Sequence, residues 1–468
     1  MATAAFRPFW LEQALRREDP PTPVPLRGEH SADVCIVGGG YTGLWTAIQL
    51  KQAAPALKIV LLEQDVCGAG ASGRNGGCLL TLATKFLSLR ACYGEAEAVR
   101  LVRASEAAVD QIADFCARHA IDAELRRDGA LYVATNRAQL SALAQVLSAL
   151  QANSVNSWQA QDAAALAQRS GSPAHLEGHF SPAAGSVQPA LLARGLARVA
   201  REMGVDVREH SPMLALEESN PPRVRCAEGS VTAKRVVLAL NAWMATLFPR
   251  FARSIAVVSS DMVITEPAPE AVAARGPAGG VSVCDLRTFV HYARSTPDGR
   301  IMMGKGGNLF PYGNRMVPAF DAPSTLTPML ADALQRFFPA YSGVPIVASW
   351  TGPSDRSATG FPFFGRFDHA PQILYGFGYS GNGVGTCYLG GKILASLALD
   401  RDDEWSRCGF VGGPRALFPP EPVRWVGAHM VRNAIRRKEC AEDEGRRATW
   451  IDQRLSRLAG AAGKADKG

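Results

Sequence analysis

The chain has 468 residues and a formal net charge of +7, with 47% hydrophobic and 20% charged residues. This composition excludes a disordered or fibrous protein and allows a packed core. The length exceeds the roughly 250–300 residues that one core supports, so we expect two domains plus an appendage. The 10 cysteines are scattered and form no C-x-x-C pair. With no apolar run long enough to span a membrane and no signal-peptide pattern at the N-terminus, a cytoplasmic protein is expected.

The first 65 residues contain the clearest structural pattern. Residues 1–30 end in a proline cluster and predict an extended lead-in. A β-branched run at 32–37 predicts a buried strand, 44–53 a helix, and 58–62 a second buried strand. Together they predict a βαβ unit with a glycine-rich turn after its first strand.

That turn carries a dinucleotide-binding fingerprint, Gly38-x-Gly40-x-x-Gly43, with the acid Glu63 located 20 residues beyond its last glycine. Gly38 permits a tight turn, Gly40 lets backbone approach a pyrophosphate, and Gly43 lets helix and strand pack closely. The helix N-terminus offers free N–H donors to phosphates. Glu63 should accept hydrogen bonds from ribose hydroxyls, which argues against NADP but leaves NAD and FAD open.

The segment 67–77 is rich in small residues and carries the polar side chains of Ser72, Arg74 and Asn75. Backbone with so few side chains can pass close to an extended ligand, and Arg74 is a natural partner for a pyrophosphate. A flexible surface loop is the alternative interpretation, and spacing alone does not decide between the two.

Further along the chain, helical periodicity alternates with short apolar runs. The patterns predict helices at 95–120, 137–151, 159–169, 189–203, 326–338 and 384–399. They predict strands at 129–134, 205–207, 213–216, 235–240, 261–265, 288–293, 301–303, 346–350 and 372–377. A second glycine-studded stretch, 376–385, opens the last of these helices.

The combination of VCIVGGGYTGLWTAIQL, VLLEQD, GAGASGRNGG, VVLALNAW and GYSGNGVG resembles the D-amino acid oxidase-type FAD-dependent oxidoreductases. Within that family the chain is most similar to the branch that contains γ-glutamylputrescine oxidase, and its opening FRPFWLEQAL resembles a subgroup described as aminophosphonate oxidoreductases. The likeness covers most of residues 30–400. One departure is Asn382, where many relatives have histidine.

The resemblance implies an α/β fold with a Rossmann-like FAD-binding domain at 31–90, 176–248 and 345–400. An interleaved α+β substrate domain with a mixed antiparallel sheet would occupy 91–175 and 249–344, and a basic helical extension 401–468. It implies non-covalent FAD, with the N-terminus of the 384–399 helix facing the flavin. The expected cofactor-binding residues are Gly38, Gly40, Tyr41, Thr42, Gly43, Glu63, Gln64, Ser72, Arg74, Asn75, Gly76, Met213, Asn241, Gly381, Gly383 and Val384.

The candidate catalytic residues lie in the second domain. The strand expected at 287–294 is rich in aromatic and cationic side chains, and a period of two puts His291 and Tyr292 on opposite faces. One face should line the substrate cavity. Lys305 is the third candidate, with a turn lysine or an anionic-substrate anchor as alternatives. Asp355 and Arg356 are further cavity candidates, and the histidines and acids form no metal-binding pattern.

These observations predict an enzyme that oxidises a small primary or secondary amine, one that could carry a carboxylate or phosphonate. Hydride transfer to flavin N5 would give an imine that hydrolyses to an aldehyde, with O2 as the favoured acceptor giving H2O2. A quinone-linked flavin amino acid dehydrogenase and a tRNA-modifying FAD oxidoreductase are the alternatives. Residues 424–468 carry 11 basic and 6 acidic residues, so most of the net charge sits in this tail and no nucleic-acid partner is expected.

Overall fold

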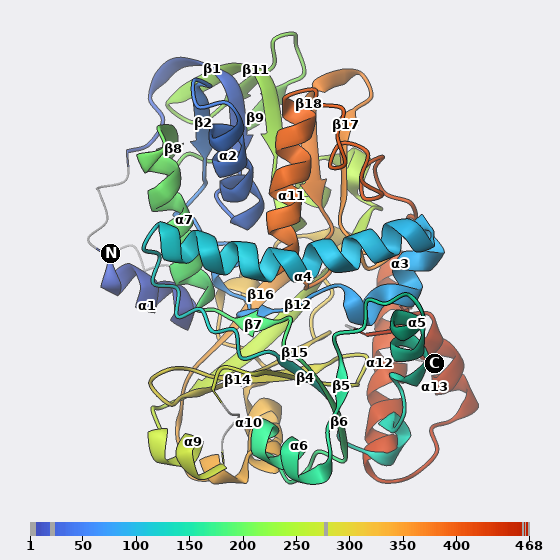
Figure 1. Cartoon of the computed structure of the whole chain (residues 1–468). Helices are drawn as coiled ribbons and strands as arrows, with labels where there is room; N and C mark the ends of the chain where they lie inside the picture. The colour runs from blue at the N-terminus through green and yellow to red at the C-terminus, as the bar shows by residue number, and fades with distance from the viewer. Residues whose placement is uncertain (1–5, 19–23, 276–278, 461–462, 464, 467–468) are drawn as a thin grey trace.

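The structure is a computed structural model that describes residues 6–18, 24–275, 279–460, 463 and 465–466. Two eight-stranded sheets organise the molecule, one in the upper and one in the lower half of Figure 1. The first sheet has the order β17-β18-β11-β1-β2-β8, with β9 and β10 attached to β11. Its strands are β1 (Gly28–Val37), β2 (Ile59–Leu62), β8 (Val205–Arg208), β9 (Ala215–Glu217), β10 (Arg223–Arg225), β11 (Gly229–Leu238), β17 (Phe363–Phe367) and β18 (Ala370–Phe377).

The central strands of this sheet are apolar because both of their faces are covered. In β1, Val34 and Ile36 join the core beneath the helices, whereas Cys35 and Val37 join the core on the opposite face. The helices on the first side include α2 (Tyr41–Ala53), α7 (Pro189–Glu202) and α11 (Gly383–Ala398), which stand in front of the sheet in Figure 1. The predicted α/β class and Rossmann-like sheet are therefore confirmed.

The second sheet has the order β16-β12-β15-β14-β13-β4-β6-β5 and is antiparallel except where β13 pairs with β4. Its outer face packs on α10 (Thr327–Phe337) through Val263, Ala293, Ile301 and Met303. The strands are β4 (Ala130–Ala134), β5 (Gln159–Ala160), β6 (Glu177–Ser181), β12 (Ile255–Thr265), β13 (Ser282–Asp285), β14 (His291–Ser295), β15 (Ile301–Gly306) and β16 (Ile346–Ser357). A small ribbon of β3 (Cys78–Leu79) and β7 (Gly185–Ser186) lies between the two large sheets (Figure 1).

Two of the expected domain boundaries are wrong. The sequence predicts 176–248 and 345–400 in the cofactor domain, yet β6 pairs with β4 and β16 pairs with β12 in the second sheet. β16 runs on from the expected 346–350 to Ser357, because it pairs with β12 as far as Ile255. Each of these pairings joins residues far apart in sequence, and a local pattern does not reveal it.

The N-terminal segment also differs from the extended lead-in that the prolines suggested. Residues Phe9–Arg17 form helix α1, which buries Trp10, Leu11 and Ala14. The side-chain amide of Gln188 donates a hydrogen bond to the carbonyl of Trp10 at 2.9 Å. Prolines 20, 21 and 23 lie outside the described residues. The first described residues are therefore part of the packed body.

The remaining helices connect and cover the sheets. α4 (Glu95–Arg118) crosses the middle of the molecule in Figure 1, close to α3 (Phe86–Tyr93). The helix expected at 159–169 starts only at Ala163, because Asp162 caps it by accepting the N–H of Ala165 at 2.8 Å. The others are α5 (Ala144–Ala152), α6 (Ala163–Ser170), α8 (Met244–Leu247), α9 (Pro269–Arg275), α12 (Val423–Asp443) and α13 (Trp450–Arg457).

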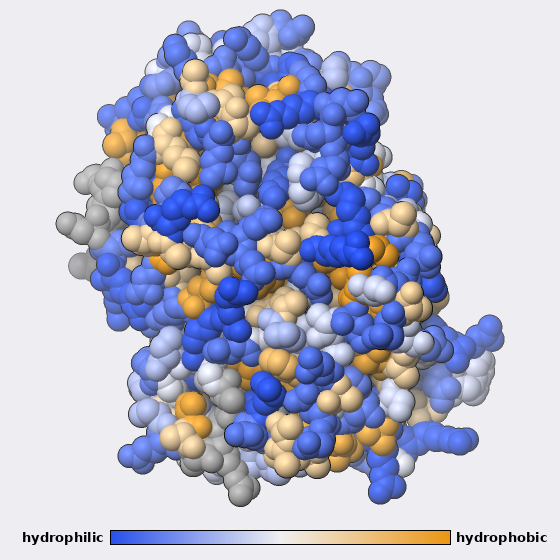
Figure 2. All heavy atoms as spheres, viewed as in Figure 1, coloured by the Kyte–Doolittle hydropathy of each residue, from blue (hydrophilic) through white to orange (hydrophobic). Residues whose placement is uncertain are grey.

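The surface is that of a packed globular protein. On the face drawn in Figure 2, hydrophilic side chains dominate and hydrophobic ones occur in small groups. In the part of the chain that the structure describes, we find no helix with the length and apolarity needed to cross a bilayer.

The first turn gives a test of the fold. A Cβ atom at Gly43 would lie 1.9 Å from the carbonyl oxygen of Gly38, so Gly43→Ala must push α2 away from β1. We expect it to lower the free energy of unfolding by about 1–3 kcal/mol, as overpacking does. Gly427→Ala in α12 is the control, because a Cβ there meets nothing within 4 Å and should stabilise the helix by up to ~1 kcal/mol. Denaturant unfolding of both variants measures the two effects, and equal stabilities would contradict the packing argument.

Candidate cofactor-binding and active site

One elongated cavity separates the two sheets and brings together nearly all of the predicted cofactor-binding residues. Of these, only Gly43 does not line the cavity, which agrees with the packing role expected for it. The predicted residues on the cavity wall are Gly38, Gly40, Tyr41, Thr42, Glu63, Gln64, Ser72, Arg74, Asn75, Gly76, Met213, Asn241, Gly381, Gly383 and Val384. The cavity thus extends from the end of β2, past the start of α2, to the start of α11.

At the first turn, small residues and backbone donors form the wall. Gly38 has a φ of +113°, and a Cβ on it would lie 2.4 Å from the carbonyl oxygen of Ala239. The hydroxyl of Ser72 accepts the N–H of Tyr41 at 2.8 Å, which ties the 67–77 segment to the start of α2. This contact explains why the segment follows the cavity, and it removes the surface-loop alternative for its central residues.

Glu63 is buried at the end of β2. Its carboxylate accepts the N–H of Gly39 at 2.7 Å and that of Asp65 at 3.0 Å. Burial raises the pKa of Glu63 to about 7, although both hydrogen bonds act in the opposite direction. A ligand hydroxyl that donated to this carboxylate would favour its ionised form.

Arg74 differs from the expectation of a pyrophosphate partner. Its Nε donates to the carbonyl of Ala69 and one Nη to that of Phe320, each at 2.7 Å, while the other Nη pairs with Asp321 at 2.7 Å. The guanidinium therefore fixes the 69–77 segment against the substrate domain, a role that the sequence did not indicate. Asn75 acts similarly, because its side chain bonds to the carbonyl of Ser72 and the N–H of Gly77.

The second glycine-rich stretch delivers an open helix N-terminus to the cavity. Gly378 and Gly381 have positive φ values of +88° and +81°, which turn the chain sharply into α11. Asn382, the residue before the helix, makes no side-chain hydrogen bond to the first turn and instead donates to the carbonyl of Thr81 at 3.3 Å. The first N–H groups of α11, beginning at Gly383, therefore remain available to a ligand that carries negative charge.

The second sheet forms the opposite wall of the cavity. Of the three catalytic candidates, one lies on the cavity side of this sheet and two lie on its other side. Tyr292 lines the cavity, and its hydroxyl lies 2.7 Å from that of Ser260 on β12. His291 and Lys305 are paired neighbours on β14 and β15 and face the other side of the sheet. There, His291 Nδ1 lies 2.8 Å from Asp285 and Lys305 donates to the carbonyl of Phe289 at 2.6 Å. Two of the three candidates thus lie outside the cavity.

Several wall residues escaped the sequence reasoning. Met262 and Ser260 on β12, Gly352 to Ser354 on β16, and Thr288 and Val290 between β13 and β14 all line the cavity. Arg356 and Asp355, the further cavity candidates, also line it. Both lie within β16. Burial raises the pKa of Asp355 to about 6, and the N–H of Gly378 hydrogen-bonds to its carboxylate at 2.5 Å.

A two-layer α/β fold with this glycine-lined cavity is characteristic of dinucleotide-dependent oxidoreductases. Residues 33–397 match the protein family described as FAD dependent oxidoreductase (DAO). γ-Glutamylputrescine oxidoreductase of Escherichia coli is 32% identical over 391 residues, which are 83% of this chain and 88% of that protein. A probable oxidoreductase, OrdL, of Haemophilus influenzae is 29% identical and covers 82% of this chain and 86% of its own length.

Solved structures agree on the fold. The crystal structure of glycine oxidase from Geobacillus kaustophilus superposes with a TM-score of 0.67 at 22% identity, covering 80% of this chain and 96% of that chain. The chain therefore belongs to the DAO family of FAD-dependent oxidoreductases. It is a flavoenzyme, its cofactor is FAD, and the predicted γ-glutamylputrescine oxidase-like branch is confirmed.

The residues present fit this cofactor. The glycine turn and the N-terminus of α2 suit a pyrophosphate, Glu63 suits the ribose hydroxyls, and the open N-terminus of α11 suits the electron-rich end of a reduced flavin. Close packing between protein atoms also requires glycine at some positions of the cavity wall. At Gly76, for example, a Cβ would lie 2.5 Å from the ring of Tyr292.

The raised pKa of Glu63 predicts how FAD binding depends on pH. If ribose hydroxyls donate to the carboxylate, binding lowers the pKa of Glu63 from about 7 and releases a proton. Affinity should then fall as the pH drops below 7, by up to about tenfold per pH unit, and stay constant above it. Fluorescence titration of FAD-depleted protein at several pH values measures this. Glu63→Gln should bind more weakly but without that slope, and the same slope in the variant would contradict the assignment.

Proposed function

We propose that the enzyme oxidises a small primary or secondary amine with an anionic tail to an imine, which water then hydrolyses to an aldehyde. FAD, when bound, would accept the hydride at N5 from the carbon next to the nitrogen, and O2 would take the electrons and leave as H2O2. The relatives of this chain support this reaction class, since they include γ-glutamylputrescine oxidoreductase and glycine oxidase of Bacillus licheniformis.

The position of Arg356 is the observation that supports an anionic tail. Its guanidinium lies between the two walls, because Cβ atoms at Gly306 and Gly381 would each approach an Nη atom to about 3.6 and 3.5 Å. Burial lowers its pKa and the neighbouring carboxylate of Asp355 acts in the opposite direction. A carboxylate or phosphonate is the group that a planar guanidinium in such surroundings binds best.

Tyr292 would orient the amine without acting as its base. Burial holds the pKa of its phenol well above the usual value, so the group stays neutral. With Ser260 at 2.7 Å, one of the two hydroxyls can donate to a ligand while it accepts from the other. An amine that enters in its neutral form needs no strong base, because the nitrogen lone pair already assists departure of the hydride.

Two further parts of the proposal concern the cellular compartment of the enzyme and its C-terminal extension. The 10 cysteines are free in the structure, which supports a reducing, cytoplasmic compartment. Helices α12 and α13 of the C-terminal extension form ion pairs, as in Arg437 with Asp452 at 2.6 Å and Lys438 with Glu442 at 2.5 Å. Paired charges support a docked extension and not a nucleic-acid surface.

The reaction is tested by mixing the enzyme anaerobically with a panel of amines that carry carboxylate, phosphonate or neutral tails. Loss of the visible flavin absorbance reports reduction whatever the acceptor. We expect bleaching by amines with anionic tails, followed by oxygen uptake and peroxide release when air is admitted. Bleaching that only an added quinone reverses would establish a dehydrogenase, and a flavin that no amine bleaches would overturn the proposal.

Arg356→Met tests the tail-binding role. Removing a charge-assisted contact should raise KM for the anionic amines by roughly 10- to 100-fold and leave neutral amines nearly unaffected. Arg356→Lys should recover part of the loss, because it keeps the charge without the planar fork. Arg366→Met is the control, since Arg366 pairs with Asp400 on the surface. An equal effect on neutral and anionic amines would remove Arg356 from substrate recognition.

A further inference from the structure

Helix α12 lies in the C-terminal extension, beyond residue 397 where the family match ends. It packs beside the second sheet, at the lower right of Figure 1. Its contacts with the sheet differ from those of α10, which covers the same face with Leu330, Leu334 and Phe337. α12 instead directs two acidic side chains, Glu439 and Asp443, toward the loop between β13 and β14.

Glu439 grips the backbone of that loop. One carboxylate oxygen accepts the N–H of Thr288 at 3.0 Å and that of Phe289 at 3.2 Å. The other oxygen lies 3.7 Å from the ammonium of Lys305, which in turn donates to the carbonyl of Phe289 at 2.6 Å. The backbone of Phe289 is therefore held at both its N–H and its carbonyl, and the Glu439 side chain is only 9% exposed.

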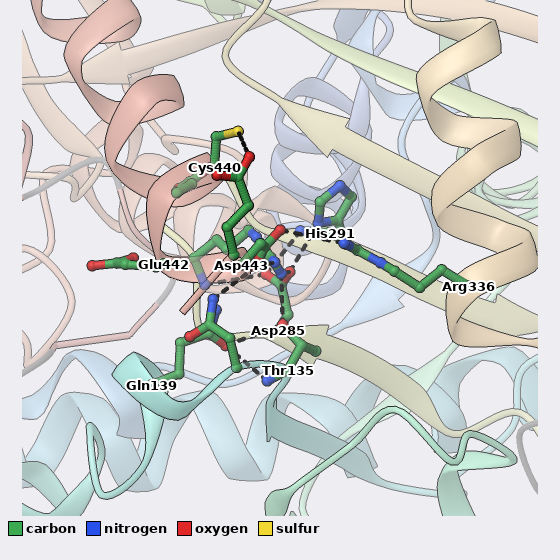
Figure 3. A network of polar contacts seen from close by, with 12 residues as sticks. Thr135, Gln139, Asp285, His291, Arg336, Cys440, Glu442 and Asp443 are labelled. Atoms are coloured by element: carbon green, nitrogen blue, oxygen red, sulfur yellow. Dashed lines mark hydrogen bonds and ion pairs between the residues drawn. The ribbon is translucent and has the colours of Figure 1, made fainter. Parts of the chain in front are cut away.

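The ends of the loop are fixed by a second set of contacts, shown in Figure 3. Asp285 accepts the backbone N–H of Arg287 at 3.1 Å and that of His291 at 3.0 Å. The guanidinium of Arg287 pairs with Asp285 and Asp443, and Asp443 also pairs with Arg336 of α10 at 3.3 Å. Although burial acts to raise it, Arg287 and His291 hold the pKa of Asp285 well below its usual value.

The side of this loop that faces away from α12 forms part of the cavity wall. Thr288 and Val290 line the cavity next to Tyr292, whereas Phe289 points the other way and fills the space above Gly307. The strand predicted at 288–293 therefore starts only at His291, because residues 286–290 leave the ladder to form this loop. A shift of the Thr288–Phe289 backbone would therefore move this part of the cavity wall.

We propose that Glu439 is a positioning residue. Through the backbone of Thr288 and Phe289 it fixes the part of the wall that Thr288 and Val290 form, and so α12 takes part in selecting the amine. The selection part of this inference rests on the proposed function; the positioning part does not. Burying a carboxylate is unfavourable for folding unless it is hydrogen-bonded or ion-paired. The contacts of Glu439 with the loop and with Lys305 therefore account for its burial, whereas packing of α12 on the sheet alone would not require a carboxylate at this position.

Three variants separate positioning from simple packing. Glu439→Ala removes both hydrogen bonds and the charge, whereas Glu439→Gln keeps an acceptor for the two N–H groups. Glu442→Ala is the matched control, because Glu442 lies on the same helix, points away from the network in Figure 3 and pairs with Lys438. If Glu439→Ala does not fold, Glu439→Met keeps the volume without the acceptor and replaces it.

The first measurement is amide hydrogen exchange of the FAD-loaded enzyme at residues 286–290. We expect at least tenfold faster exchange at Thr288 and Phe289 in Glu439→Ala, near wild-type exchange in Glu439→Gln, and no change in Glu442→Ala. Unchanged exchange in Glu439→Ala would overturn the positioning role. This result does not depend on any substrate, so it stands apart from the fate of the proposed reaction.

The second measurement is the split between kcat and KM over the amine panel. Glu439→Ala should raise KM roughly tenfold for the preferred amine and narrow the discrimination between large and small tails, with kcat within about threefold of wild type. Glu439→Gln should restore both values. If exchange increases while KM and discrimination stay constant, the loop is positioned without selecting the substrate and the selection part fails. If no amine bleaches the wild-type flavin, the proposed function fails and the exchange result alone decides the positioning part.

Discussion

The cofactor cavity depends on one close approach, that of helix α2 to strand β1. The carbonyl of Gly38 and the α-carbon of Gly43 are so near that no side chain fits between them. This contact sets the direction of α2, and the direction of α2 decides where its free N–H groups point. Ser72 then bonds to the first turn of α2, so the 67–77 segment takes its course from the same contact. The geometry at the pyrophosphate end therefore follows from two glycines.

At the other end of the cavity, buried charge takes the place of close backbone packing. The second sheet presents Tyr292 to the cavity and Lys305 to its back, where Glu439 pairs with Lys305 and Asp285 pairs with Arg287. Since each buried charge there has an opposite charge beside it, the network is stable only as a whole. The wall of the substrate end is accordingly supported from behind by groups that never meet a ligand.

Local sequence patterns predict the pyrophosphate end of the cavity far better than the substrate end. The fingerprint glycines, Glu63 and Ser72 act within one βαβ unit and the segment that follows it, so spacing alone brings them together. His291 and Tyr292 show the limit of such reasoning. Alternation puts them on opposite faces, yet only the packing of α10 and α12 determines which face meets the cavity. Arg74 shows the same limit, because its partners Phe320 and Asp321 lie more than 200 residues away in sequence.

The order in which the chain visits the two sheets has a further consequence. It builds β1 and β2 in the first sheet, β4 to β6 in the second, β8 to β11 in the first again, β12 to β16 in the second, and β17 and β18 in the first. Neither layer is a contiguous stretch of sequence, so neither can be completed during synthesis before most of the chain has emerged. The first sheet lacks β18, the partner of β11, until residue 377 has been made. FAD therefore binds late in synthesis, because a nascent chain that ends before β18 has an incomplete cofactor site.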